Sequence, residues 1–323
     1  MSHEITGNLG GMDLISIDDV EAAAGSIAGV AVRTPLLPCR WDGELLLKPE
    51  SLQPVGSFKI RGATHAVASV PAERRSRGVV THSSGNHGQA LAYAARAAGA
   101  PCMVVIPDVA PAVKIEQVRA LGATVVLVPP ARRLAEAERL AAEGGLTLIP
   151  PFDHRDVIAG QGTIGLEIIA DLPDVDVVLV PVGGGGLASG VATAVKALRP
   201  EAAVIGVEPE YAADARDSLA AGELVTWPVE QTYRTIADGV RTNLSELTFA
   251  HLRERLDAIV TVSEEEIRAA MSRLVRESRL VVEPSGAVAT AAHLFRRDKL
   301  PPGRTVAVIS GGNVDPALLV SVV

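Results

Sequence analysis

The sequence has few cysteines and few aromatic residues. Only two of its 323 residues are cysteine, and phenylalanine, tyrosine and tryptophan together make up 3%. Cys39 and Cys102 lie far apart, and their spacing fits neither a disulfide framework nor a cysteine metal site. A reducing compartment is therefore the expected setting.

Long apolar runs and basic clusters are also missing. No segment approaches the roughly 20 apolar residues that a membrane span requires, and the N-terminal residues lack the apolar region of a signal peptide. The formal charge is −8, from 30 basic and 38 acidic residues, which argues against general binding to nucleic acid or anionic membranes. We expect a cytoplasmic protein with neither of these partners, and mobile residues 1–12.

Short apolar runs instead alternate with helical patterns. Strands are predicted in residues 78–83, 102–107, 123–129, 146–152, 175–182, 202–209, 258–263 and 305–310, and helices in residues 86–99, 111–122, 134–145, 186–200 and 264–278. Continuous Val/Ile runs between helices are typical of parallel strands buried on both faces. The pattern predicts a doubly wound α/β fold that binds ligands at the carboxyl ends of its strands.

Four consecutive glycines stand between a predicted strand and a predicted helix. In "VDVVLVPVGGGGLASG" the glycine backbone can approach an anion closely, and the helix N-terminus adds its positive dipole. A phosphate or carboxylate ligand is expected. A flexible turn, or a dinucleotide site with the loose pattern Gly183, Gly185 and Ala188, are the alternatives. The loop residues are Gly183, Gly184, Gly185 and Gly186.

Polar residues also follow the strand "GVVTHS", where a second helix begins. Hydroxyls, an amide and free N–H groups converge there, as in a ligand site, although a helix cap formed by Ser84 or Asn86 would use the same residue types. The residues are Ser83, Ser84, Gly85, Asn86 and His87.

Lys59 lies in an apolar segment, "LQPVGSFKIRGA", where a helix should begin. Desolvation there lowers the pKa of an amine, and such a lysine can form a Schiff base. The alternative is a surface lysine whose stem packs on apolar neighbours. Ser310 ends another strand and faces the same crevice. A lysine nucleophile, a phosphate cradle and this serine together suggest pyridoxal phosphate.

The chain resembles the serine/threonine dehydratase and serine racemase family, which are fold-type II pyridoxal-phosphate enzymes. The motifs "GSFKIRGA", "SSGNHGQA", "VIAGQGTIGLEI", "PVGGGGL", "IADGV" and "SGGNVD" occur in the family's order and spacing. The resemblance implies two doubly wound lobes with the cofactor in the cleft. We expect residues 1–70 and 155–323 to form the large lobe and residues 75–153 the small lobe.

The resemblance also implies roles for individual residues. Lys59 should carry the cofactor and act as general base, and Phe58 should pack beside the ring. Asn86 should contact the phenolic oxygen of the cofactor, and Ser310 its unprotonated pyridine nitrogen. The four loop glycines should hold the phosphate, and residues Ser83 to His87 the substrate carboxylate.

The expected activity is a threonine/serine ammonia-lyase, which removes water and ammonia from a β-hydroxy amino acid and leaves a 2-oxo acid. The alternative is a serine racemase with side lyase activity, because Ser84 matches the residue that faces the lysine in racemases. Dehydratases also carry a serine there, and Phe152 resembles dehydratases. The substrate-side arginine of racemases falls on Ala135 here, and Arg132 and Arg133 lie slightly earlier. Either arginine could pair with an acidic substrate such as 3-hydroxyaspartate, and a solvated surface pair is the alternative.

The racemase-like branch of the family also binds a divalent cation. The matching positions are Glu208, the carbonyl of Ala212, and Asp214, whose hard oxygens suit Mg²⁺, with Ca²⁺ or Mn²⁺ as alternatives. Two acidic residues that cap the following helix would give the same pattern. We also expect a homodimer without a C-terminal regulatory domain. A non-catalytic ligand-binding relative and a nucleotide-dependent dehydrogenase are competing readings from other classes.

Overall fold

The computed structural model describes residues 13–83 and 85–323, so the expectations for residues 1–12 and for Ser84 lie outside the described residues. Two sheets organise the chain. The larger has the order β1-β2-β10-β7-β8-β9, and the smaller has the order β5-β4-β3-β6. The strands are β1 (Leu37–Pro38), β2 (Leu45–Pro49), β3 (Val79–Thr81), β4 (Cys102–Pro107), β5 (Thr124–Val128), β6 (Thr147–Leu148), β7 (Val177–Pro181), β8 (Ala203–Pro209), β9 (Ala258–Val262) and β10 (Thr305–Ile309).

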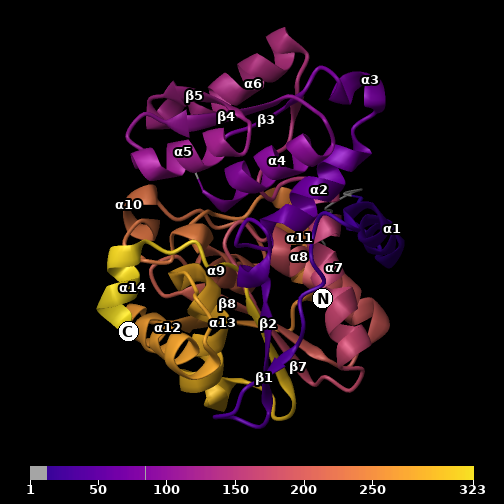
Figure 1. The fold of residues 1–323 in the computed structure, drawn as a ribbon. Helices are drawn as coiled ribbons and strands as arrows, with labels where there is room; N and C mark the ends of the chain where they lie inside the picture. Colours follow the sequence, from indigo (N-terminus) through magenta and orange to yellow (C-terminus); the bar gives the residue numbers. More distant parts are fainter. Residues whose placement is uncertain (1–12, 84) are drawn as a thin grey trace, which may run out of the picture.

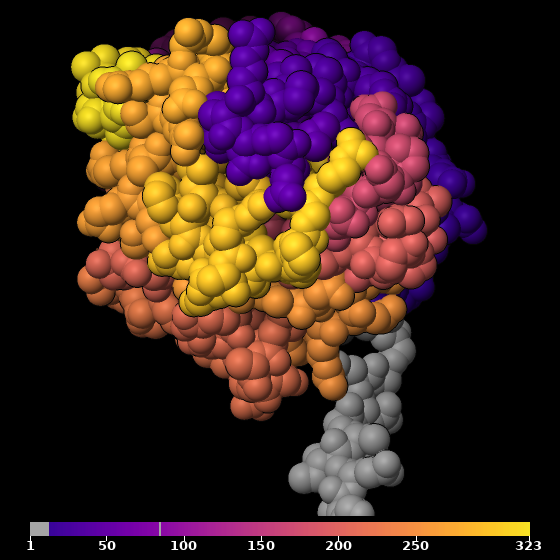
Figure 2. Space-filling model, turned by 90° about the horizontal axis from the view of Figure 1, so that it is seen from below, coloured from indigo at the N-terminus to yellow at the C-terminus, as the bar shows by residue number. Residues whose placement is uncertain are grey.

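All strand pairs except β1–β2 are parallel, and the predicted α/β fold is confirmed. Strands β7 and β10 are buried along their whole length, as their continuous Val/Ile runs require. β2 lies beside β10 although more than 250 residues separate them in sequence. Seen from below, the early chain in indigo accordingly adjoins the C-terminal chain in yellow (Figure 2).

Helices cover both sheets. Their bounds are α1 (Ile17–Ile27), α2 (Lys59–Ser69), α3 (Ala72–Arg75), α4 (Asn86–Ala97), α5 (Ala112–Ala120), α6 (Arg133–Gly144), α7 (Arg155–Asp171), α8 (Gly186–Leu198), α9 (Asp214–Ala221), α10 (Val229–Thr232), α11 (Glu246–Arg255), α12 (Glu264–Ser278), α13 (Pro284–Phe295) and α14 (Pro316–Val322). Among the described residues, none of these helices has the length and apolar character that a membrane crossing needs.

Helix α2 lies between the two sheets, below α4 in Figure 1. Its apolar residues Ile60, Ala63 and Val67 share a core with β3, β4 and α4 of the smaller sheet. Its other side packs against α7, which in turn packs against α8. The domain boundaries expected from the sequence stay a prediction, because α2 contacts the cores of both halves.

Glycines allow these helices to approach closely. A β-carbon on Gly160 of α7 would lie 2.6 Å from the Arg61 carbonyl of α2, and one on Gly190 of α8 would lie 2.3 Å from the Ile158 carbonyl of α7. Both clashes would be with backbone atoms, which cannot turn aside as the end of a flexible side chain can. The three helices α2, α7 and α8 are therefore held in one rigid arrangement.

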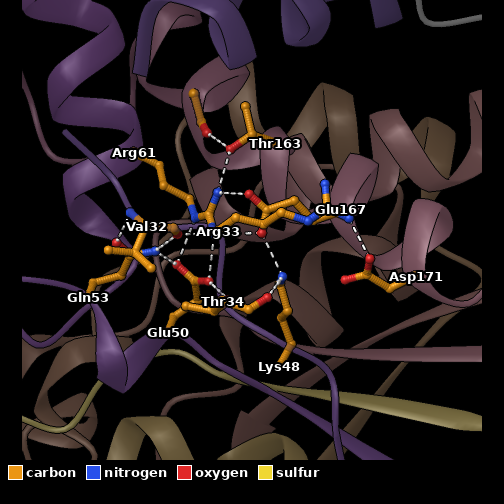
Figure 3. Close-up of polar contacts among 11 residues, drawn as sticks. Val32, Arg33, Thr34, Lys48, Glu50, Gln53, Arg61, Thr163, Glu167 and Asp171 are labelled. Atoms are coloured by element: carbon orange, nitrogen blue, oxygen red, sulfur yellow. Dashed lines mark hydrogen bonds and ion pairs between the residues drawn. The ribbon is translucent and has the colours of Figure 1, made fainter. Parts of the chain in front are cut away.

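A buried network of ion pairs surrounds Arg61, two residues after Lys59 (Figure 3). Arg61 contacts Glu50 at 2.7 Å and Glu167 at 2.7 Å, and Lys48 contacts Glu167 at 2.6 Å. The side chains of Arg61, Lys48 and Glu50 are fully buried. Two positive and two negative charges balance, so no charge of this network is left unpaired in the interior.

Hydrogen bonds complete this network. Glu50 also accepts from Thr34 and Gln53, and Arg61 donates to Thr163. Burial alone would raise the pKa of Glu50, but the charge and hydrogen bonds of Arg61, the Thr34 hydrogen bond and the charge of Lys48 together outweigh it, and the pKa lies below its usual range. The ionised carboxylate therefore stabilises the fold above the unfolded-state pKa of about 4.3, and this stabilisation is lost as the pH falls below that value.

We predict that Arg61→Met destabilises the protein by about 3–5 kcal/mol, because Glu50 and Glu167 would face each other inside the protein with only Lys48 as a partner. The urea midpoint at pH 7 measures the effect. The control is Arg119→Met, which removes an exposed pair with Glu116 and should change stability by less than about 0.5 kcal/mol. Equal shifts for the two variants would contradict a structural role for the network.

Candidate active site

Lys59 begins α2 directly beside the end of β10. Ser57 forms an isolated bridge with Gly311, and the Phe58 amide donates to the carbonyl of Ser310 at 3.0 Å. The segment that carries Lys59 is thus hydrogen-bonded to the strand end that carries Ser310. The two motifs "GSFKIRGA" and "SGGNVD", distant in sequence, meet at one place.

The amine of Lys59 has no charged partner among the described residues. Its Nζ donates to the carbonyl of Pro151 at 2.6 Å and lies 4.9 Å from the centre of the Phe58 ring. Burial lowers the pKa of Lys59 to about 8. A lysine with this pKa is roughly one-tenth neutral at pH 7, whereas an ordinary lysine is almost entirely charged.

The glycine loop is packed closely against its neighbours in the chain's fold. A β-carbon on Gly184 would lie 2.5 Å from the Phe152 ring, and one on Gly183 would lie 2.6 Å from Cα of Val240. Gly185 has φ = +84° and precedes the first residue of α8, Gly186. The loop therefore needs glycine for space and for backbone conformation, and it ends at a helix N-terminus, where an anion is favoured.

Phe152 connects this loop to Lys59. Its ring packs on Gly184, while the preceding Pro151 carbonyl accepts from the Lys59 amine. Lys59 and the glycine loop therefore contact two adjacent residues, Pro151 and Phe152. This contact was not anticipated, although Phe152 was singled out in the sequence.

Asn86 begins α4 and is fixed by two partners. Its Nδ2 donates to Glu283 at 2.8 Å, and its Oδ1 accepts from Asn313 at 2.7 Å. Burial, with the charge of Asp238 as a further cause, raises the pKa of Glu283 to about 7. Neither Glu283 nor Asn313 was a candidate in the sequence. Asn313 lies in "SGGNVD", and Glu283 directly precedes a proline that starts α13, which were the available signals.

His87 is buried and neutral. Burial, with the charge of Lys59 next, lowers its pKa to about 3, and its Nε2 contacts the carbonyl of Ile149 at 2.9 Å. Its Nδ1 has no partner among the described residues. Ser83 Oγ accepts from the Gly85 amide at 3.3 Å in the same turn. The turn is thus stabilised by a hydrogen bond between its own residues, and the charge of Lys59 acts on its last residue, His87.

Ser310 is buried, and its Oγ donates to the carbonyl of Ser285 at 3.2 Å. Ser285 Oγ in turn accepts from the amide of Gly239 at 2.8 Å, next to the Val240 that packs on the glycine loop. The motif "IADGV" therefore joins the end of β10 to the loop. This long, neutral contact leaves Ser310 able to turn toward a ligand.

The candidate metal ligands Glu208 and Asp214 are both buried. Glu208 accepts from the amides of Ala215 and Arg216 in the first turn of α9, which is the helix-capping alternative. Burial, with the Asp214 charge next, raises the pKa of Glu208, and burial raises that of Asp214 to about 6. Within the described residues, no three His, Cys, Asp or Glu side chains form a metal-binding group.

The candidate residues for an acidic substrate differ in their exposure. Arg132 and Ala135 are exposed, whereas Arg133 is half-buried. Burial lowers the pKa of His82, at the end of β3, and the charge of Arg133 lowers it further. The charge of Arg133 is thus felt at His82, which directly precedes Ser83.

Comparison with known proteins identifies the family. Residues 27–311 match the family model described as "Pyridoxal-phosphate dependent enzyme". The chain belongs to this family. The match covers most of the chain, which confirms the resemblance seen in the motifs and supports pyridoxal phosphate as the cofactor.

Three relatives show the range of activities. L-threonine ammonia-lyase of Thermotoga maritima is 43% identical, covering 94% of this chain and 76% of the relative. L-threo-3-hydroxyaspartate ammonia-lyase of Saccharomyces cerevisiae is 40% identical, covering 92% and 93%. The crystal structure of serine racemase from Dictyostelium discoideum is 39% identical with a TM-score of 0.87, covering 93% and 99%. The similarity confirms the fold-type II architecture.

We predict that Gly185→Ala weakens cofactor binding, because the new β-carbon would lie 2.7 Å from Leu244 and the residue would keep a positive φ. Gly222→Ala is the matched control, since Gly222 has φ = +74° but open space around it. Both variants should lose about 1 kcal/mol from backbone strain. Only Gly185→Ala should raise the Kd of pyridoxal phosphate in an absorbance titration, and equal Kd values would contradict the assignment of the loop.

Proposed function

We propose that this protein is a threonine/serine ammonia-lyase that converts a β-hydroxy amino acid to a 2-oxo acid and ammonia. The observation that carries the proposal is the desolvated amine of Lys59. This amine donates to the carbonyl of Pro151, beside the glycine loop. The residue before it, Phe58, is hydrogen-bonded to Ser310 at the end of β10. A 43% identical relative named L-threonine ammonia-lyase supports the choice of reaction.

The residues fit pyridoxal phosphate. Lys59 supplies an amine without a charged partner, the glycine loop offers a phosphate cradle, and Ser310 offers a hydroxyl. The half-buried Asn86, with Glu283 and Asn313 as fixed partners, supplies an amide beside them. When bound, the cofactor supplies an electron sink that stabilises negative charge at the substrate Cα.

The chain itself must then orient the substrate and move protons. Backbone N–H groups of the turn around Ser83 and His87, at the start of α4, bind the substrate carboxylate. Lys59, with its pKa near 8, accepts the Cα proton as general base at neutral pH. His87 is neutral at this pH, so it adds no positive charge that would lower the pKa of Lys59 further. Lys59 then gives this proton to the β-hydroxyl, so that the Cβ–O bond breaks and the hydroxyl leaves as water.

A second candidate substrate is 3-hydroxyaspartate. The charge of the half-buried Arg133 acts on His82, which follows β3, and its guanidinium is the basic group that would pair with a second substrate carboxylate. A relative named L-threo-3-hydroxyaspartate ammonia-lyase, 40% identical, supports this alternative. Racemisation would use Ser84 as the second base, and that role stays a prediction, as do the homodimer and the cytosolic location.

A divalent cation at Glu208 and Asp214 is also part of the proposal. Each Glu208 oxygen uses one lone pair to accept from an amide of α9 and keeps another. Among the described residues, no lysine, arginine or histidine forms an ion pair with Glu208 or Asp214. The Ala212 carbonyl, two residues before Asp214, would be the third ligand. Hard oxygen ligands of this kind favour Mg²⁺, Ca²⁺ or Mn²⁺.

The function is tested by incubating the cofactor-loaded enzyme with L-threonine, L-serine and threo-3-hydroxyaspartate. We expect 2-oxo acid and ammonia in equal amounts, measured by coupled reduction and by ammonia assay. Lys59→Ala should lose both the visible absorbance of the lysine-bound cofactor and at least about 1,000-fold in rate. Chiral chromatography that shows mostly D-serine from L-serine would instead identify a racemase.

The cation proposal predicts that Mg²⁺ or Mn²⁺ at saturation raises the Tm of the holoenzyme by about 3 °C or more, because binding to the folded state stabilises it. Asp214→Asn should abolish this rise. Glu210→Gln, an exposed carboxylate two residues from Glu208, is the control and should keep it. An unchanged Tm with every cation, measured by calorimetry after chelation, would leave Glu208 and Asp214 as capping residues only.

A further inference from the structure

Gln161 is a fully buried side chain near the centre of α7. Neither its Oε1 nor its Nε2 has a hydrogen-bond partner among the described residues. Buried amides almost always find partners, because an unsatisfied donor or acceptor loses its water without compensation. An amide with both ends unsatisfied therefore indicates a partner that binds from outside the chain.

The amide lies between the helices that carry the two main parts of the site. A β-carbon on Gly186, the first residue of α8, would lie 3.1 Å from Gln161 Oε1. A β-carbon on Gly62, in the first turn of α2, would lie 3.1 Å from Gln161 Nε2. One end of the amide thus faces the end of the glycine loop, and the other faces the first turn of the helix that starts at Lys59.

The position of Gln161 is fixed by its neighbours on α7. Gly160 packs against the backbone of Arg61 and Gly62, and Gly162 packs within 2.8 Å of the Gly190 carbonyl, both measured from an added β-carbon. These contacts pack α7 closely against both α2 and α8. The backbone of Gln161 therefore lies between these two helices, and its side chain is buried there.

The terminal amide has one donor end and one acceptor end of nearly identical shape. Turning it by 180° about its last bond exchanges the two ends without changing the space that it fills. The NH₂ group can then face the start of α8, where the free N–H groups of the helix also point. A donor in this place complements an oxyanion.

We propose that Gln161 donates a hydrogen bond to the phosphate group of the bound cofactor, as a side-chain contact in addition to the backbone N–H groups of the loop. The inference rests on the proposed use of the glycine loop as the phosphate site. It gives "VIAGQGTIGLEI" a ligand-binding role that none of its apolar and glycine residues could supply. Gln161 is a binding residue in this proposal and takes no part in proton transfer.

The test compares two ligands that differ only in the phosphate. The cofactor is removed from the full-length protein with hydroxylamine, and the Kd values of pyridoxal phosphate and of pyridoxal are measured by absorbance. Both aldehydes can react with Lys59 in the same way. The ratio of the two Kd values therefore reports the contribution of the phosphate contacts alone.

Gln161→Met keeps the length of the side chain and removes both polar ends. We expect the preference for pyridoxal phosphate over pyridoxal to fall about tenfold or more, which corresponds to about 1.4 kcal/mol. The Kd of pyridoxal should change less than about threefold, because its binding uses no phosphate contact. Gln161→Glu, which places a negative charge at the same point, should reduce the preference further, and it serves as a second variant if the methionine variant does not fold.

Thr290→Val is the matched control, because Thr290 is also buried and its Oγ1 has no partner in the part of the chain that the structure describes, but it lies on α13. It should leave the preference unchanged. Equal losses for both ligands in Gln161→Met, or no loss in either variant, would overturn the proposal. If the wild-type protein itself binds pyridoxal as tightly as pyridoxal phosphate, the assignment of the glycine loop fails, which is a separate outcome.

Discussion

The buried network around Arg61 is the interaction on which the rest of the structure depends. It joins β2, α2 and α7 through four compensating charges, and it lies two residues from Lys59 on the same helix turn. Residues two apart on a helix point in nearly opposite directions. Arg61 therefore faces carboxylates that keep it charged, while Lys59 faces the site, where burial without a counter-charge lowers its pKa.

This arrangement explains how a cationic residue becomes reactive inside a stable protein. The network supplies the stability, since each of its charges is paired and hydrogen-bonded, and the site next to it can leave one amine without a charged partner. Helix α7 packs closely against α2 at Gly160 and against α8 at Gly162. The helices that begin at Lys59 and at the glycine loop thus both pack on α7.

Local patterns predicted the central parts of the fold and site. Each strand expected from an apolar run is present, and the helix predicted in residues 264–278 has the same bounds in the structure, because a serine cap and an acidic first turn mark its start. β2 was not predicted, since its fully buried Lys48 interrupts the apolar pattern. A buried lysine needs a compensating negative charge, and Glu167 supplies it from more than one hundred residues away in sequence.

The sequence by itself determined which residues could do chemistry, because the glycine run, the lysine in an apolar segment and the serine at a strand end each have a local physical meaning. Only the tertiary structure decided their partners. Glu283, Asn313 and Gln161 carry only weak local signals. A proline follows Glu283 and quoted motifs contain the other two, but an acidic residue before a proline, an asparagine in a loop or a glutamine in a helix is ordinary. Their burial and their contacts depend on packing between elements far apart in the chain, and packing is not written in the pattern of any one segment.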